Sequence, residues 1–301
     1  MNKGIIGAIL LVGLVVLTSG CINSNKEETN VTTGNLEIVT DVQPSTIYTG
    51  SSGMIQVKVK NNWGTELKNA QLTLYGTGVQ FVSEDSECSN TMFCIASEQT
   101  KDIGDLRAHM SVPTIQTYTI KAPEIAITGT VTPTLCFDVE QVFQQGYAVK
   151  NTRRDFTPVT TSITSTQTEG PLEMTVESSQ VNPIIFQGEP AERTIAITLT
   201  NNITGSYIKE IKNIEMTLTN PSDLSMSISK ILVNGDEGTV NGNVATYSKT
   251  PSYLTNTITI YPTLKITSAP QDVPMIGTMQ IKVNMTYCMK GNSVTLTTKT
   301  V

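Results

Sequence analysis

Four cysteines carry the clearest chemistry in this chain. The first residues, Lys3 followed by an uncharged apolar run from Ile5 to Leu17, have the order of a secretory signal segment. Export brings cysteines to an oxidising environment, where they pair as disulfides. Cys88 and Cys94 lie close together in a polar loop, and we expect them to pair. Their Cys-x5-Cys spacing is not one that zinc sites use, so no metal site is predicted.

Cys136 and Cys288 occupy matching places on two later strands. Alternation along the first strand puts Cys136 with Asp138, on the face opposite Leu135 and Phe137. If the two strands belong to separate domains, they lie about a domain length apart. We therefore expect Cys136 and Cys288 not to bond to each other unless the domains pack side by side. A bond between the domains, or to another molecule, is the open alternative.

No residue set has the spacing of a known active site. His109 is the single histidine, and no Gly-x-Ser-x-Gly or similar nucleophile context occurs. Acidic residues gather in two turns, at 84–87 and 234–238, without the spacing of an EF-hand loop. We interpret both as solvated turns, and calcium binding through their carboxylate and carbonyl oxygens is the open alternative. The sequence thus predicts no catalytic residue, no metal and no cofactor, and a protein that is not an enzyme.

The apolar run ends in a short motif, Leu17-Thr18-Ser19-Gly20-Cys21. As a helix the run would span about 20 Å, short of the roughly 30 Å hydrocarbon core of a bilayer. The motif resembles the lipobox of prokaryotic lipoproteins at Ser19, Gly20 and Cys21, with Thr18 where leucine is usual. The resemblance implies a signal peptide at residues 1–20, a lipid on Cys21 and anchoring at the extracytoplasmic face of the cell membrane. An uncleaved anchor, a plain signal peptide and a pilin-type leader are the alternatives.

Composition points to strands and to an acidic surface. The charged fraction is 15%, the net charge is -6, and the longest basic run is Arg153-Arg154. Such a surface disfavours nucleic acid and anionic lipid as partners. Threonine occurs 47 times, and β-branched residues fit pleated, half-exposed strands. Because no apolar stripe of helical period follows the signal segment, we predict an all-β protein.

The chain after residue 34 repeats itself once. Residues 21–34 are predicted to be a flexible tether, and a Thr/Ser-rich linker at 157–170 separates two copies at 35–156 and 171–301. The offset between the copies drifts from 136 to 148 residues. The paired landmarks are Leu36-Glu37 with Leu172-Glu173, Asn61-Asn62 with Asn201-Asn202, Lys68-Asn69 with Lys212-Asn213, and Gly129-Thr130 with Gly277-Thr278. Each copy has about seven short strands, which predicts two tandem immunoglobulin-like β-sandwich domains that fold independently.

Tandem sandwiches behind a lipobox resemble archaeal cell-envelope proteins related to S-layer and CARDB-type adhesion modules. The segment Asp102-Ile103-Gly104-Asp105-Leu106, before an Ile-x-Thr-Tyr-Thr strand, resembles a segment common in those modules, with Arg107-Ala108-His109 in place of the usual Pro-Gly. The resemblance implies a surface structural or binding role. In an exported archaeal protein the sequons at Asn30, Asn202 and Asn284 are possible glycosylation sites.

These observations predict a non-catalytic, lipid-anchored cell-surface protein with a structural or adhesive role. Its expected partners are the membrane, through the lipid on Cys21, and other envelope proteins or glycans, with no nucleic acid. The alternative is an accessory solute- or polymer-binding lipoprotein of an envelope complex or transporter. A solute binder should have one deep apolar site between its domains, whereas an adhesive module should have flat sheet faces and exposed strand edges.

Overall fold

The computed structural model describes residues 32–33, 36–82, 87–160, 163–248, 256–271 and 273–300. The predicted signal peptide, Cys21 and Asn30 lie outside the described residues. Within the described ranges, no helix has the length and apolar character needed to cross a membrane.

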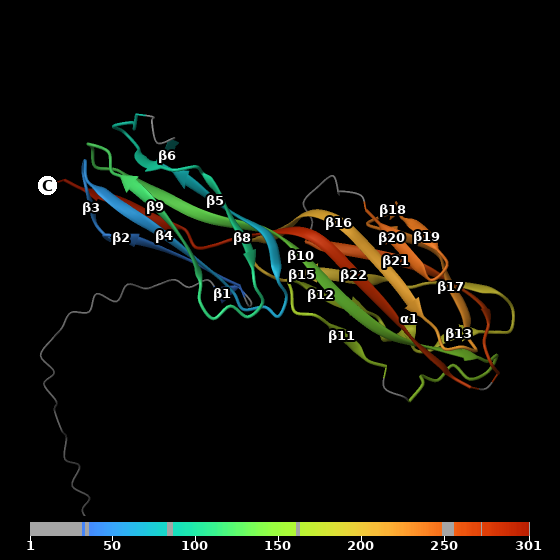
Figure 1. The fold of residues 1–301 in the computed structure, drawn as a ribbon. Helices are drawn as coiled ribbons and strands as arrows, with labels where there is room; N and C mark the ends of the chain where they lie inside the picture. The colour runs from blue at the N-terminus through green and yellow to red at the C-terminus, as the bar shows by residue number, and fades with distance from the viewer. Residues whose placement is uncertain are drawn as a thin grey trace, which may run out of the picture.

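Two elongated lobes lie end to end along one axis (Figure 1). The first lobe holds β1 (Thr32–Thr33), β2 (Leu36–Gln43), β3 (Ile47–Tyr48), β4 (Ser52–Asn61), β5 (Leu67–Thr77), β6 (Val79–Val82), β7 (Phe93–Ala96), β8 (Thr100–Leu106) and β9 (Thr114–Lys121). The second lobe holds β11 (Ser165–Gln167), β12 (Leu172–Val176), α1 (Ser178–Val181), β13 (Ile184–Phe186), β14 (Ala191–Thr194), β15 (Ile197–Asn201), β16 (Ser206–Thr219), β17 (Ser225–Val233), β18 (Asp236–Glu237), β19 (Thr239–Asn241), β20 (Val244–Tyr247) and β21 (Thr257–Ser268). Two long strands, β10 (Thr128–Asn151) and β22 (Met275–Lys290), run through both lobes, and the last strand, β23 (Val294–Lys299), lies in the first lobe.

Alternating burial explains why these segments form strands. In β4, Ile55, Val57 and Val59 are fully buried, while the residues between them are half-exposed. Apolar side chains on one face and threonines or charged residues on the other suit a sheet that packs on one side only. The predicted all-β class is confirmed.

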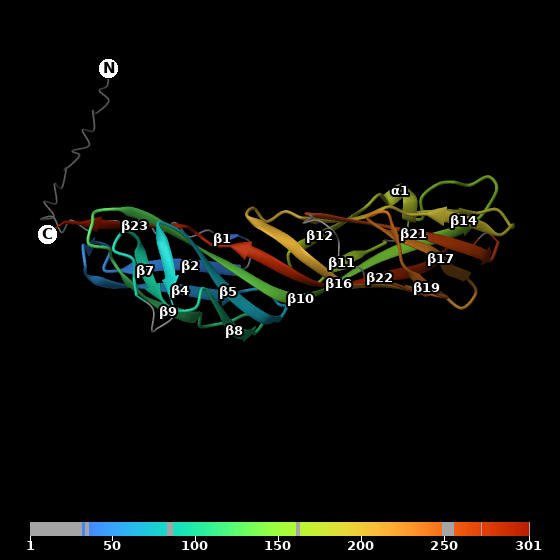
Figure 2. The ribbon, with the colours of Figure 1, turned by 90° about the horizontal axis from the view of Figure 1, so that it is seen from above.

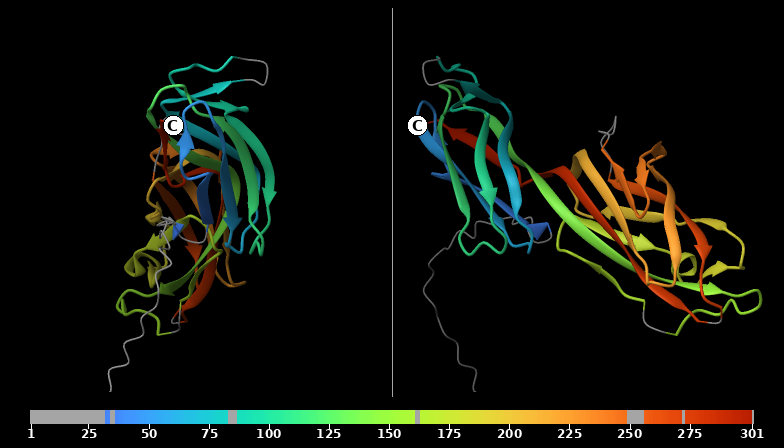
Figure 3. Two further views of the ribbon diagram at one scale, coloured as in Figure 1. Left: turned by 90° about the vertical axis from the view of Figure 1, so that its left-hand side faces the viewer. Right: turned by 45° about the vertical axis from the view of Figure 1, so that its right-hand side comes forward.

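Three sheets make up the two lobes. One six-stranded sheet (β1-β2-β4-β9-β7-β6) belongs to the first lobe, and another (β12-β15-β21-β17-β18, with β14 beside β21) belongs to the second. The third sheet has eleven strands and contains β10 and β22 at its centre. It runs through both lobes, as the unbroken course of β10 in Figure 3 shows. The lobes are therefore joined by sheet hydrogen bonds as well as by loops.

The repeat seen in the sequence is also present in the strand registers. Leu36 pairs with Asn61 between β2 and β4, and Leu172 pairs with Asn201 between β12 and β15. Within the first pair, Asn61 is fully buried, and its Nδ2 donates to the carbonyl oxygens of Thr65 (2.9 Å), Leu106 (3.2 Å) and Arg107 (3.0 Å). The two repeats thus start from the same strand pairing, although Asn201 Nδ2 donates to the side chains of Ser206 and Asn256 and not to backbone carbonyls.

Each lobe is completed by the last strand of the other repeat. The C-terminal part of β10 enters the second lobe, where it pairs in parallel with β13, Lys150 opposite Ile185 and Asn151 opposite Phe186. Strand β23 returns to the first lobe (Figure 2) and pairs in parallel with β3, Thr298 opposite Ile47 and Lys299 opposite Tyr48. The two exchanged strand segments occupy corresponding positions in the two sequence repeats.

This exchange bears on the predicted boundary at 157–170. Those residues include β11, which pairs with β10, and the range 171–301 includes β23, which lies in the first lobe. The boundary between the lobes therefore does not coincide with the Thr/Ser-rich stretch. How far residues 35–156 and 171–301 fold on their own stays a prediction.

Candidate functional site: a polar groove at the waist

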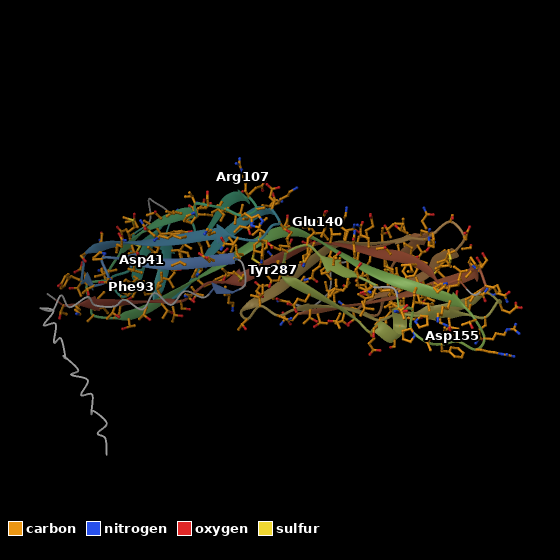
Figure 4. All side chains as sticks on the ribbon, turned by 90° about the horizontal axis from the view of Figure 1, so that it is seen from below. Asp41, Phe93, Arg107, Glu140, Asp155 and Tyr287 are labelled. Atoms are coloured by element: carbon orange, nitrogen blue, oxygen red, sulfur yellow. A yellow bond between two sulfur atoms is a disulfide. The ribbon has the colours of Figure 1, made fainter. Side chains whose placement is uncertain are left out.

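The two lobes meet where β10 and β22 pair antiparallel, and we call this region the waist. Asp138 pairs with Thr286 there, and these two residues occupy equivalent positions in the two repeats. The waist therefore lies on a local two-fold axis that relates the repeats. Figure 4 labels Glu140 and Tyr287, both near the middle of the long axis, with Asp155 at one end of the molecule.

Under the waist the strands are held by buried aromatic rings. Phe137 lies between Trp63 and Tyr287, with ring centroids 6.1 and 5.7 Å away. The Tyr287 hydroxyl donates to Asn201 Oδ1 at 2.7 Å and also contacts Ser206 Oγ. Burial raises the pKa of Tyr287 to about 12, more than its hydrogen bonds lower it. This inner face is a packed core that fixes the outer face above it.

A β-bulge in each repeat turns a Lys-Asn pair toward the outer face of the waist. In β5 the register shifts between Leu67 and Ala70, and Asn69 has a φ of 50°. In β16 the register shifts between Ile211 and Asn213. A bulge changes the direction in which side chains point. A non-glycine residue with a positive φ keeps that backbone conformation because the surrounding structure holds it. The same irregularity at the same place in both repeats positions Lys68-Asn69 and Lys212-Asn213 around one opening.

That opening is a groove of about 640 Å³ on the outer face, which we call the waist groove. Its charged and amide-bearing lining residues are Glu66, Lys68, Asn69, Asp138, Glu140, Lys212, Asn213 and Asn284. None of the described residues that line it is aromatic, and Val139, Val142 and Met285 add apolar surface to it. The groove therefore mixes polar side chains with apolar surface and is not the deep apolar site expected of a solute binder.

Asp138 is the centre of a hydrogen-bond network in the groove. Its carboxylate accepts from Asn69 Nδ2 (2.8 Å), Lys212 Nζ (2.6 Å) and Thr286 Oγ1 (2.7 Å). Partial burial pushes the pKa of Asp138 upward, but the donors, with Lys212 foremost, outweigh burial and hold the pKa below its ordinary value. Asp138 thus stays ionised and ties the first repeat to Lys212 of the second.

Other polar side chains of the groove lack such hydrogen bonds in the described part of the chain. Within the described residues, the side chains of Lys68, Asn213 and Asn284 make no hydrogen bond or ion pair, and Glu140 meets only Lys282 at 3.9 Å. Asn213 and Asn284 are half-buried neighbours in register. These groups are free to take hydrogen bonds from a bound molecule or from water.

Beside the groove, Cys136 and Cys288 form a disulfide, with an S–S distance of 2.09 Å and a Cα–Cα distance of 4.1 Å. The prediction that these cysteines do not bond is wrong. It placed the two strands in separate sandwiches, whereas the two strands pair directly, with Cys136 opposite Cys288. Cys88 and Cys94 are also joined, at a Cα–Cα distance of 5.7 Å, as the sequence favoured.

The remaining residues singled out from the sequence lie apart from one another. Asn202 is exposed, and its Nδ2 donates to Glu173 Oε2 at 2.6 Å, whereas Asn284 lies inside β22 at the groove. His109 Nδ1 lies 3.0 Å from the carbonyl oxygen of Asn62. No group of three or more potential metal ligands occurs among the described residues. The structure therefore points to a site that the sequence did not, although the repeated Lys-Asn pair was its visible signal.

Comparison with known proteins finds no matching family model and no matching curated protein. Similar solved structures include the secreted serine protease VesC from Vibrio cholerae (9% identity, TM-score 0.21, covering 77% of this chain and 47% of that one). Others are the Yersinia pseudotuberculosis adhesin InvE (11%, 0.18, 90% and 60%) and the Enterococcus faecalis surface protein ACE (11%, 0.18, 87% and 95%), described as binding its ligands by the collagen hug model. The chain spans about half the length of the first of these.

The likeness to VesC corrects one prediction. The sequence predicted that the protein is not an enzyme, and a secreted serine protease stands among the similar structures. That prediction no longer stands, and the similarity assigns no activity in its place. The TM-scores are too low to transfer an activity, a ligand or a site residue from any of these structures.

Proposed function

We propose that the protein is a lipid-anchored surface protein whose stiff β-rod has a structural or adhesive role. The observation that carries this proposal is the continuous sheet at the waist. Strand β10 passes through both lobes. The whole of β22, from Met275 to Lys290, pairs with β10. Bending the rod at the waist would break ladder hydrogen bonds, because the lobes share one sheet.

The position of the chain ends supports the same proposal. The described chain starts at Thr32, and the last strand ends at Lys299, both in the first lobe (Figure 1). A lipid on Cys21 would therefore attach to the first lobe and leave the second lobe to project from the membrane. The chain from residue 21 to residue 32 can reach at most about 40 Å when fully extended.

Two measurements on cells test the proposal. Substitution Cys21→Ser should move the protein from the detergent phase to the aqueous phase in a detergent partition assay, or block its processing. Cells that lack the protein should attach less to a surface or to each other, and restoring wild-type protein should recover attachment. Unchanged partitioning would rule out the lipid anchor, and unchanged attachment together with an unaltered envelope would rule out the structural or adhesive role.

The alternative, an accessory polymer-binding lipoprotein, is favoured by one observation. At the place where the lobes are joined, the waist groove offers polar side chains from both repeats that have no partner among the described residues. A rod that displays such a groove can hold a polymer of the envelope as well as span a distance.

A further inference from the structure

We propose that the waist groove binds a neutral, hydroxyl-rich saccharide. The inference rests on the proposed surface function and names a ligand class for the site described above. Asn213 and Asn284 lie side by side on neighbouring strands, half-buried and with no side-chain partner among the described residues. A carboxamide offers two donor hydrogens and an acceptor oxygen, which suits sugar hydroxyls because each of these both donates and accepts.

The groups around this amide pair can also form hydrogen bonds with sugar hydroxyls. On the other side of β22, Glu140 of β10 pairs with Asn284. A carboxylate and two carboxamides therefore follow one another across β10, β22 and β16. Lys68 adds three donor hydrogens from the bulge of the first repeat and makes no ion pair among the described residues. Lys212 cannot play the same part, because its ammonium is bound to Asp138 at 2.6 Å. Within the described part of the groove, the first repeat thus supplies an unpaired cation, and the second supplies unpaired amides.

The lining also excludes other classes of ligand. Three carboxylates (Glu66, Asp138 and Glu140) face two ammonium groups, which disfavours phosphate and sulfate. The oxygens of Asp138 already accept three hydrogen bonds, which disfavours a metal ion. A nucleobase would require an aromatic stacking surface, which the described residues of this lining do not provide.

The two central strands of the waist offer no edge to an extended peptide. At the waist β10 is paired with both β5 and β22, and β22 is paired with both β10 and β16. Neither β10 nor β22 therefore has an open edge there for a peptide to add a strand. The binding groups that the groove offers are polar side chains on a sheet face, and such side chains bind hydroxyl groups of a ligand.

The saccharide could come from two sources, because Asn284 is itself part of a sequon. A glycan linked to Asn284 would lie in the groove of its own chain. A free glycan of the envelope would bind from outside. Both present the same hydroxyl chemistry to Lys68 and Asn213.

The test uses the mature full-length chain from two hosts. Protein made in a bacterium that lacks N-glycosylation is titrated calorimetrically with maltotetraose, cellotetraose and chitotetraose. Protein from its own host is digested, and the peptide that contains Asn284 is weighed by mass spectrometry. We expect either binding of at least one tetrasaccharide or a hexose-containing mass on Asn284.

Variants locate the binding. Lys68→Ala and Asn213→Ala should each weaken tetrasaccharide binding at least tenfold, whereas Lys265→Ala and Asn243→Ala, exposed outside the groove, should leave it within twofold. If the glycan is linked, the two groove variants should make the sugar on Asn284 more accessible to an endoglycosidase. Because Lys68 is exposed, its variant keeps the test valid if Asn213→Ala does not fold.

Two outcomes would overturn the inference. One is that no probe binds and Asn284 carries no sugar. The other is that binding, or sugar accessibility, responds equally to groove and control variants. Cell attachment is measured separately, so the proposed function and this inference can fail independently.

Discussion

At the scale of single residues, one buried asparagine organises the turn that begins the waist. The Asn61 side chain satisfies three backbone carbonyls and accepts from the N–H of Trp63 at 3.0 Å. Substitution Asn61→Ala leaves these groups buried without partners, at a cost of at least about 2 kcal/mol of unfolding free energy. Urea unfolding should show this loss. Asn62→Ala, which removes only the bond to Glu37 Oε1, is the matched control and should cost less than about 1 kcal/mol.

A second residue-scale prediction concerns the acid dependence of Asp138. Its pKa in the folded protein lies below the ordinary value of 3.8, because Lys212, Asn69 and Thr286 donate to it. The bonds therefore stabilise the fold above pH 4, and this stabilisation is lost as the pH falls through the lowered pKa. Asp138→Asn should melt at a lower temperature than wild type at pH 6, and the difference should shrink at pH 2.5. An equal difference at both pH values would contradict this role.

At the scale of elements, the exchanged strand β23 is the feature with the most direct consequence. Leu296 of β23 is buried, although it comes from the second repeat and lies in the first lobe. Leu296→Ala should destabilise the protein by about 2–5 kcal/mol. Hydrogen exchange should accelerate in β2, β4 and β9 before it does in β15 and β21. Faster exchange confined to the second lobe would show that the strand is not exchanged in solution.

The same element explains what could and could not be predicted from the sequence. Alternation in β4 and the repeated Asn-Asn turns were visible, so the all-β class and the internal repeat could be predicted. The exchange could not, because periodicity shows which face of a strand is buried and not which lobe buries it. Residues Leu135 to Phe143 alternate between buried and more exposed without a break through the waist. The groove was missed because it is made by bulges, which a single sequence does not mark.

At the scale of the whole molecule, the two disulfides have unequal effects. The cysteines of Cys136–Cys288 are 152 residues apart in sequence, and those of Cys88–Cys94 are 6 apart. By the loop-entropy relation, removing the first bond costs about 5 kcal/mol and removing the second about 2 kcal/mol. Denaturant unfolding of the double-serine variants should give this order. A larger loss for the Cys88→Ser/Cys94→Ser variant would mean that chain closure is not what the long-range bond contributes.

The long-range bond also decides how force passes through the rod. Both described chain ends lie in the first lobe, and the loop closed by Cys136 and Cys288 contains the strands of the second lobe from β11 to β21. Pulling on the ends should therefore unfold the first lobe and stop at the disulfide, leaving the second lobe as a head that bears no load. In single-molecule stretching, Cys136→Ser/Cys288→Ser should extend further than wild type by about 500 Å, at roughly 3.5 Å per residue. Cys88→Ser/Cys94→Ser, the matched control, should add only about 20 Å. Equal lengths for wild type and the first variant would show that the second lobe lies in the path of the force.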